Sequence, residues 1–288
     1  MNESFRQALL DGERAGLART LVPPRKAQML AGGQREGRRA GGSLEFRDYR
    51  DYEPGDDLRH LDWSLFARSD KLAVKRFNEE VSPFVDLIVD GSRSMALEPP
   101  KGEVTLALAA MFATAARNGG FPYALWMARD SISRVAHGSE RASLWNDVEL
   151  EYPGDPASAV VRGASLLRPF SIRIFLSDLL WPSDPEPLMH ALSGGASAAI
   201  VIEVAAGVDE RPDGRGDVRL IDVENGAEQD IVLDDAALST YRDALLRHRQ
   251  LWDEAARDSH VLLLRCVADD VGPDLMFDAL AQAEIVTC

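Results

Sequence analysis

The sequence is poor in cysteine, lacks an apolar leader and contains no long hydrophobic run. Its two cysteines, Cys266 and Cys288, have no metal-type spacing and imply no disulfide framework, which suits a reducing compartment. The N-terminal residues 1–13 lack the apolar core of a secretion signal. The longest run of low polarity, residues 106–116, is too short to cross a bilayer. These absences predict a soluble cytoplasmic protein without membrane insertion.

Positive charge is also scarce. The chain has 32 Lys and Arg against 47 Asp and Glu, a net charge of −15, and a pI of about 4.8. So acidic a protein is a poor general ligand for nucleic acid or anionic membrane, so neither is expected as a partner. The first 80 residues are Arg-rich and nearly neutral, whereas the remainder is acidic. The Arg-rich segment either attracts the acidic remainder of the chain, offers a surface to an acidic partner, or is ordinary solvated surface.

Strand and helix patterns alternate after residue 80. Residues 84–89 form a continuous apolar run, which is typical of a strand covered on both faces. The alternation predicts an α/β fold: a doubly wound, mostly parallel sheet flanked by helices. Asn225-Gly226, between two strand-like runs, predicts a small β-hairpin insertion. We expect an α/β domain over residues 81–288 and an Arg- and aromatic-rich N-terminal extension over residues 1–80. The extension is predicted to be helical over 3–30, with an interruption at Pro23-Pro24.

Two predicted strands end in polar side chains. Asp90, Ser92 and Ser94 follow the first core strand, and Asp178 follows the strand over 171–176. Ligands of such sheets bind at the carboxyl ends of the strands. Carboxylate and hydroxyl oxygens suit Mg²⁺ (or Mn²⁺), so the set predicts a metal site. The alternative is that these residues cap the helices that follow.

Two enzyme classes place a catalytic residue at the end of a strand, as Asp90 is placed here. A phosphatase of the haloacid dehalogenase type would use Asp90 as nucleophile but needs a second Asp at the position of Ser92. A serine hydrolase would need G-x-S-x-G and a His partner, and the five histidines show no motif. The residues offer no general base and no activated nucleophile.

D-x-S-x-S after a buried strand, with a later strand-end Asp, resembles the metal-ion-dependent adhesion site of von Willebrand factor type A domains. An upstream block narrows the resemblance to domain-of-unknown-function family 58, a bacterial family with a type A fold that is often associated with MoxR-type AAA+ ATPases. The block comprises Gly37-Arg-Arg39, Leu44-Glu-Phe46, Asp48-Tyr-Arg50, Tyr52, Pro54-Gly-Asp-Asp57, Arg59, Leu61-Asp-Trp63, Ala67-Arg68, Leu72 and Val74-Lys75.

The resemblance implies a binding or adaptor module and not a catalyst. Its metal would keep one open position for an acidic side chain of a client protein, with Asp90, Ser92 and Ser94 as ligands and Asp178 holding coordinated water. Type A domains usually add a loop Thr. The matching stretch, residues 152–158, has none, so the resemblance makes Asp155 or Ser158 the replacement, or leaves the site weak or empty.

The upstream block has two interpretations. It is a docking face for the ATPase, or an ion-paired lid in which Asp56, Asp57 and Asp62 pair with arginines while Trp63 and Phe66 pack on the sheet. The residues that the docking interpretation assigns to partner binding are Arg38, Arg39, Arg50, Asp56, Asp57, Arg59, Trp63 and Arg68.

Three hypotheses of function follow. The first is a non-catalytic, cytoplasmic adaptor that works with a MoxR-type ATPase in the assembly or maturation of other proteins. The second is a metal-dependent phosphoester hydrolase that uses Asp90. The third is a structural domain with a degenerate, empty metal site.

Overall fold

The computed structural model describes residues 3–22, 44–53, 61–69, 71–79, 84–138, 140–212 and 214–287. The chain divides into two compact units. The first comprises Met1–Pro24 and Pro83–Cys288, and the second comprises Arg25–Ser82.

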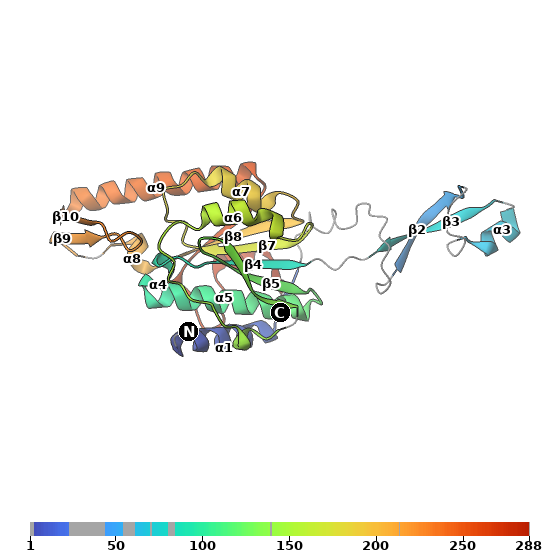
Figure 1. The fold of residues 1–288 in the computed structure, drawn as a ribbon, viewed down its shortest axis with the longest axis horizontal. Helices are drawn as coiled ribbons and strands as arrows, with labels where there is room; N and C mark the ends of the chain where they lie inside the picture. The colour runs from blue at the N-terminus through green and yellow to red at the C-terminus, as the bar shows by residue number, and fades with distance from the viewer. Residues whose placement is uncertain are drawn as a thin grey trace. The chain divides into compact units, whose positions relative to one another are not determined.

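A six-stranded sheet in the order β11-β8-β7-β4-β5-β6 forms the centre of the first unit (Figure 1). Its neighbouring strands are parallel except for β6, which runs antiparallel to β5 at one edge. The strands are β4 (Val85–Asp90), β5 (Tyr123–Ala128), β6 (Ile132–Gly138), β7 (Ile172–Ser177), β8 (Ala198–Ala205) and β11 (Leu262–Val267). This arrangement confirms the predicted α/β fold with a mostly parallel sheet.

Helices cover both faces of the sheet (Figure 1). On β4, Leu87 and Val89 pack into the core on the α5 side, whereas Ile88 packs into the opposite core. The strand is therefore apolar throughout, as a strand buried on two faces requires. The helices are α5 (Pro99–Asn118) on one face and α6 (Ala157–Gly163), α7 (Pro185–Ser193) and α9 (Asp235–Asp258) on the other. Shorter elements are α4 (Ser94–Leu97), α8 (Gly207–Glu210), α10 (Asp278–Ala283), η2 (Ala142–Leu144), η3 (Ala164–Leu166) and η4 (Ala268–Asp270).

The first helix corrects the expected domain boundary. α1 (Glu3–Leu17) packs directly on α5, and a Cβ atom at Gly12 would lie 2.1 Å from the carbonyl oxygen of Ala107. Residues 3–22 therefore belong to the α/β unit and not to the extension predicted over 1–80. The first part of the helical segment predicted over 3–30 ends at Leu17, before the predicted interruption at Pro23-Pro24, and the Asn118 side-chain amide donates to the Gly16 carbonyl there at 3.0 Å. Residues 23–30 lie outside the described residues. β1 (Thr20–Leu21) then pairs with β12 (Val286–Thr287).

The predicted hairpin insertion is confirmed. β9 (Gly216–Ile221) pairs antiparallel with β10 (Glu228–Leu233), and Gly226 in the turn has φ +73°, a conformation that favours glycine. The hairpin lies at the same end of the unit as α4 and α8 (Figure 1). In the described part of the chain, no helix combines the length and apolar character needed to span a bilayer.

The second unit contains a two-stranded antiparallel ribbon and a short helix. β2 (Leu44–Asp51) pairs with β3 (Ala73–Glu79), with an irregularity between Phe46 and Asp48. The helix α3 (Trp63–Ser69) lies between them in sequence.

Candidate functional site

The strand order places two of the predicted site residues beside each other. The chain leaves β4 toward β5 and β6 on one side, then returns to β7, β8 and β11 on the other. Such a reversal opens a crevice at the carboxyl ends of the two central strands. Val89 of β4 pairs with Leu176 of β7, so Asp90 and Asp178 leave the sheet at the same place.

Gly91 lets the chain turn sharply after Asp90. Its amide donates to the carbonyl of Ala128 at 2.8 Å, and a Cβ atom on Gly91 would lie 2.9 Å from that oxygen. Across the turn, the Tyr152 amide donates to the Gly91 carbonyl at 2.9 Å and the Arg93 amide donates to the Tyr152 carbonyl at 3.0 Å. These bonds fix the D-x-S-x-S turn against the loop that starts at Tyr152.

Asp90 is fully buried, with 0% of its surface exposed. One carboxylate oxygen accepts from the Ser92 amide at 2.8 Å, and the other accepts from the Ser177 hydroxyl at 2.6 Å. Burial, followed by the charge of Asp178, raises the pKa of Asp90 to about 7, although the hydrogen bonds from Ser177 and Ser92 oppose the rise. The Ser92 and Ser94 hydroxyls share a hydrogen bond of 3.0 Å.

Lys101, in the first turn of α5, is a site residue that the sequence analysis missed. It is 1% exposed, and its ammonium donates to Asp178 Oδ2 at 2.9 Å and to Asp209 Oδ2 at 3.2 Å. Burial lowers the pKa of Lys101, but the charges and hydrogen bonds of Asp178 and Asp209 outweigh it and raise the pKa overall, so the side chain is a buried cation. The signal available in the sequence was a lone lysine at the start of an Ala-rich helix.

Glu224, in the β9–β10 turn, was also missed. Its two carboxylate oxygens accept hydrogen bonds from the backbone amides of Ser94 at 2.9 Å and Gly154 at 2.8 Å. Ser94 belongs to the D-x-S-x-S turn, and Gly154 belongs to the loop over residues 152–158, which has no Thr. The loop therefore contributes a backbone amide to this rim.

Asp155, the predicted replacement for the Thr, makes different contacts. Its carboxylate accepts from the Ala157 amide at 2.6 Å and from the Ser183 hydroxyl. Among the described residues, no group of three or more His, Cys, Asp or Glu side chains is arranged to hold a metal ion. Any metal at this site would depend on serine hydroxyls as well as carboxylates.

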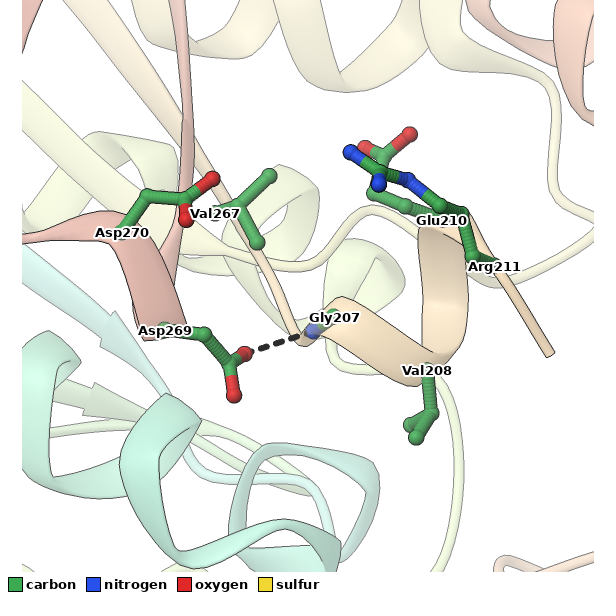
Figure 2. A pocket seen from close by; sticks show the side chains of 7 residues that line it. All are labelled: Gly207, Val208, Glu210, Arg211, Val267, Asp269 and Asp270. Carbon is green, nitrogen blue, oxygen red and sulfur yellow. Dashed lines mark hydrogen bonds between the residues drawn. The ribbon is translucent and has the colours of Figure 1, made fainter. Parts of the chain in front are cut away.

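A pocket of about 380 Å³ adjoins this cluster at the carboxyl ends of β8 and β11. Figure 2 shows Asp269 accepting a hydrogen bond from the Gly207 amide, at 2.6 Å, across the pocket wall. The wall helix α8 also carries Asp209 to Lys101. The lining residues are Gly207, Val208, Glu210, Arg211, Val267, Asp269 and Asp270. The pocket is thus next to the buried ion pair but is lined by other residues.

The predicted partner-binding residues fall in the second unit. Arg38, Arg39, Asp56, Asp57 and Arg59 lie outside the described residues. Arg50 lies 3.4 Å from the carboxylate of Glu53. Trp63 is 60% exposed and contacts Phe66 edge to face, with ring centroids 6.4 Å apart. Arg68 is exposed and donates to the Ser64 carbonyl at 3.0 Å.

Asp62 caps a helix of the second unit. Its Oδ1 accepts from the amides of Ser64 at 2.9 Å and Leu65 at 3.0 Å, which caps the N-terminus of α3. Its Oδ2 accepts from the Tyr49 hydroxyl at 2.8 Å, which ties the helix to β2. Asp directly before a helix is a recognisable capping signal.

Comparison with known proteins gives a family and a set of uncharacterized relatives. The model of the family described as protein of unknown function DUF58 matches residues 48–251. The uncharacterized proteins Rv1480 of Mycobacterium tuberculosis and Mb1516 of Mycobacterium bovis are each 28% identical over 223 residues, covering 73% of this chain and 70% of theirs.

Three solved structures are similar at low identity. Conserved hypothetical protein BatB from Bacteroides thetaiotaomicron has a TM-score of 0.35 and 12% identity over 64% of this chain and 90% of that chain. An aerotolerance-related membrane protein from Bacteroides fragilis has a TM-score of 0.38 and 13% identity, over 70% and 95%. A von Willebrand factor type A protein from Catenulispora acidiphila has a TM-score of 0.31 and 13% identity, over 65% and 44%.

Proposed function

Because the chain belongs to the family described as protein of unknown function DUF58, a description that assigns no activity, we propose a function from the site itself. The protein is a non-catalytic binding module that takes an acidic side chain of a partner protein at the carboxyl ends of β4 and β7. The observation that carries this proposal is the convergence of Asp90, Ser92, Ser94 and Asp178 at the sheet crevice, where ligands of such folds bind.

The donors in this set are carboxylate and hydroxyl oxygens, which are the type of ligand that Mg²⁺ (or Mn²⁺) prefers. The two groups that donate to the buried Asp90 carboxylate are neutral, and the nearby charge of Asp178 disfavours its ionisation. A cation with hard-oxygen preference would relieve that repulsion. The residues that would hold it are Asp90, Ser92 and Ser94, with Asp178 beside them. When bound, the ion supplies an open coordination position for a carboxylate.

Calorimetric titration of Mg²⁺ and Mn²⁺ tests the ion. Heat in the wild type that disappears in an Asp90→Ala/Ser92→Ala double variant supports the metal site. Absence of heat in both proteins would remove the ion from the proposal and favour the structural-domain alternative, since the loop Thr is missing.

The burial of Asp90 argues against a phosphoester hydrolase. A nucleophilic carboxylate must meet the phosphorus atom of a phosphoester, which is a far bulkier ligand than a metal ion, whereas Asp90 is 0% exposed. Ser92 also stands where a general acid is required. We expect no hydrolysis of generic phosphoesters in the presence of Mg²⁺. Activity that an Asp90→Asn substitution abolishes would overturn the non-catalytic proposal.

The partner that we propose is a MoxR-type AAA+ ATPase of the bacterial cytoplasm, acting with this module on a client protein that carries the acidic residue. The second unit supports a docking role through its exposed Trp63 and Arg68, since exposed aromatic and Arg side chains are common anchors of protein interfaces. Binding of the purified ATPase, measured with Mg²⁺ and ATP, should weaken in a Trp63→Ala/Arg68→Ala variant. Failure of the wild type to bind any such ATPase would remove this partner.

A further inference from the structure

Glu224 connects a hairpin to the rim of the candidate site. It is half-buried, whereas its neighbours in the hairpin are largely exposed, with Ile221 at 62% and Val232 at 60%. Its two oxygens accept from amides that lie 130 and 70 residues away in the sequence, those of Ser94 and Gly154. The carboxylate is the same chemical group that the proposed partner would present.

The turn that carries Glu224 is well ordered by its own hydrogen bonds. Asp222 Oδ1 accepts from the amides of Glu224 at 2.8 Å and Asn225 at 3.2 Å, and Asp222 Oδ2 accepts from the Asn225 side chain at 2.7 Å. The Gly226 amide closes the turn onto the Asp222 carbonyl at 2.7 Å. The hairpin therefore presents the Glu224 side chain in a defined position.

The two segments that carry the Ser94 and Gly154 amides are hydrogen-bonded to each other. Ser94 is the last residue of the D-x-S-x-S turn, and Gly154 lies two residues after Tyr152. Hydrogen bonds between Gly91, Arg93 and Tyr152 join these two segments. Both segments border the crevice that contains Asp90. A carboxylate that spans Ser94 and Gly154 therefore lies across the mouth of the site.

We propose that Glu224 is an internal ligand: it closes the site, and the acidic side chain of a partner binds by displacing it. This inference rests on the proposed function and adds its regulation. The hairpin acts as a lid, and its release couples partner binding to a movement of β9 and β10. A tethered carboxylate has an effective concentration on the order of mM or more, so a partner with one acidic contact must also bind elsewhere on the chain.

Amide exchange and acetate titration test the lid on the full chain. Hydrogen exchange at the Ser94 and Gly154 amides is measured by NMR in wild type, Glu224→Ala and Glu224→Gln. The matched control is Glu228→Ala, which removes an exposed carboxylate from the same hairpin, one that contacts Arg219. Glu224→Ala should speed exchange at both amides at least about tenfold, since each loses its acceptor. Glu224→Gln, which retains one acceptor oxygen, should have an intermediate effect, and the control should have none.

Acetate then replaces the missing side chain. In Glu224→Ala, acetate should bind saturably, with shifts at the Ser94 and Gly154 amides and a dissociation constant at least about tenfold below that of the wild type, because the internal competitor is gone. Equal exchange rates in all variants would overturn the lid and leave the acidic-partner proposal standing. Faster exchange without tighter acetate binding would overturn displacement by a carboxylate. The proposed function fails separately, if acetate in the presence of Mg²⁺ binds Ser92→Ala as tightly as it binds wild type.

Discussion

The buried ion pair under the site gives a quantitative prediction. Lys101→Met removes the ammonium while keeping an unbranched side chain of similar length, so little cavity forms. Asp178, whose side chain is 1% exposed, then loses its cation and retains the Leu180 amide as a donor at 3.1 Å. Breaking a buried pair by removing one partner costs about 3–5 kcal/mol. We expect the free energy of unfolding to fall by that amount, a large share of the roughly 5–15 kcal/mol of a typical domain.

Urea unfolding followed by far-UV circular dichroism measures this loss. Lys71→Met is a matched control, because Lys71 is exposed and surface substitutions usually stay within about 0.5 kcal/mol. Adding Asp178→Asn to Lys101→Met should recover roughly 1–3 kcal/mol, since the neutral amide needs no counter-charge. A Lys101→Met variant within about 1 kcal/mol of wild type would refute the inference that Lys101 balances the charge of Asp178.

Three further changes test other parts of the structure. Gly12→Ala should destabilise the protein by about 1–3 kcal/mol or more in urea unfolding, because its Cβ would lie 2.1 Å from the Ala107 carbonyl oxygen; an unchanged midpoint would contradict the close packing of α1 on α5. Without divalent cations, wild type should lose stability relative to Asp90→Asn as pH rises from about 4 to about 7, at up to about 1.4 kcal/mol per pH unit, because the pKa of Asp90 is raised from 3.8 to about 7 in the folded state. A variant with the same pH profile as wild type would contradict this expectation. Burial, and then the charge of Glu203, raise the pKa of the Cys266 thiol to about 12, so in a Cys288→Ser variant maleimide labelling at pH 8 should be slow until urea unfolds the chain.

The sheet could be predicted from the sequence because strands buried on both faces appear as continuous apolar runs. The runs that become β4 and β7 are of this kind, and their carboxyl ends lie at the same edge of the sheet. Side chains that follow them, such as Asp90 and Asp178, could therefore be expected at one crevice. The Asn225-Gly226 turn could also be predicted, because it depends on two adjacent residues and on the positive φ that its glycine adopts.

The missed residues depend on contacts between distant segments. From the sequence alone, Lys101 cannot be distinguished from a solvated lysine. It is buried because the folded chain brings the start of α5 into contact with Asp178 and with Asp209 of α8. Glu224 reaches the site because the turn of the β9–β10 hairpin contacts Ser94, from which it is 130 residues distant in the sequence. The end of α1 similarly depends on Asn118. Asp62 is different, because its capping role could be predicted from its position directly before a helix.

The charges around the crevice explain why a lid of this kind suits a binding module. The charge of Asp178 disfavours the ionisation of Asp90, and Lys101 forms ion pairs with Asp178 and Asp209. A free carboxylate is therefore repelled by the interior of the site and is held at its rim by the amide hydrogens of Ser94 and Gly154. Glu224 already occupies these donors. An acidic partner gains affinity if it displaces Glu224 from these two amides, and a partner that binds only after this displacement favours the open state of the hairpin.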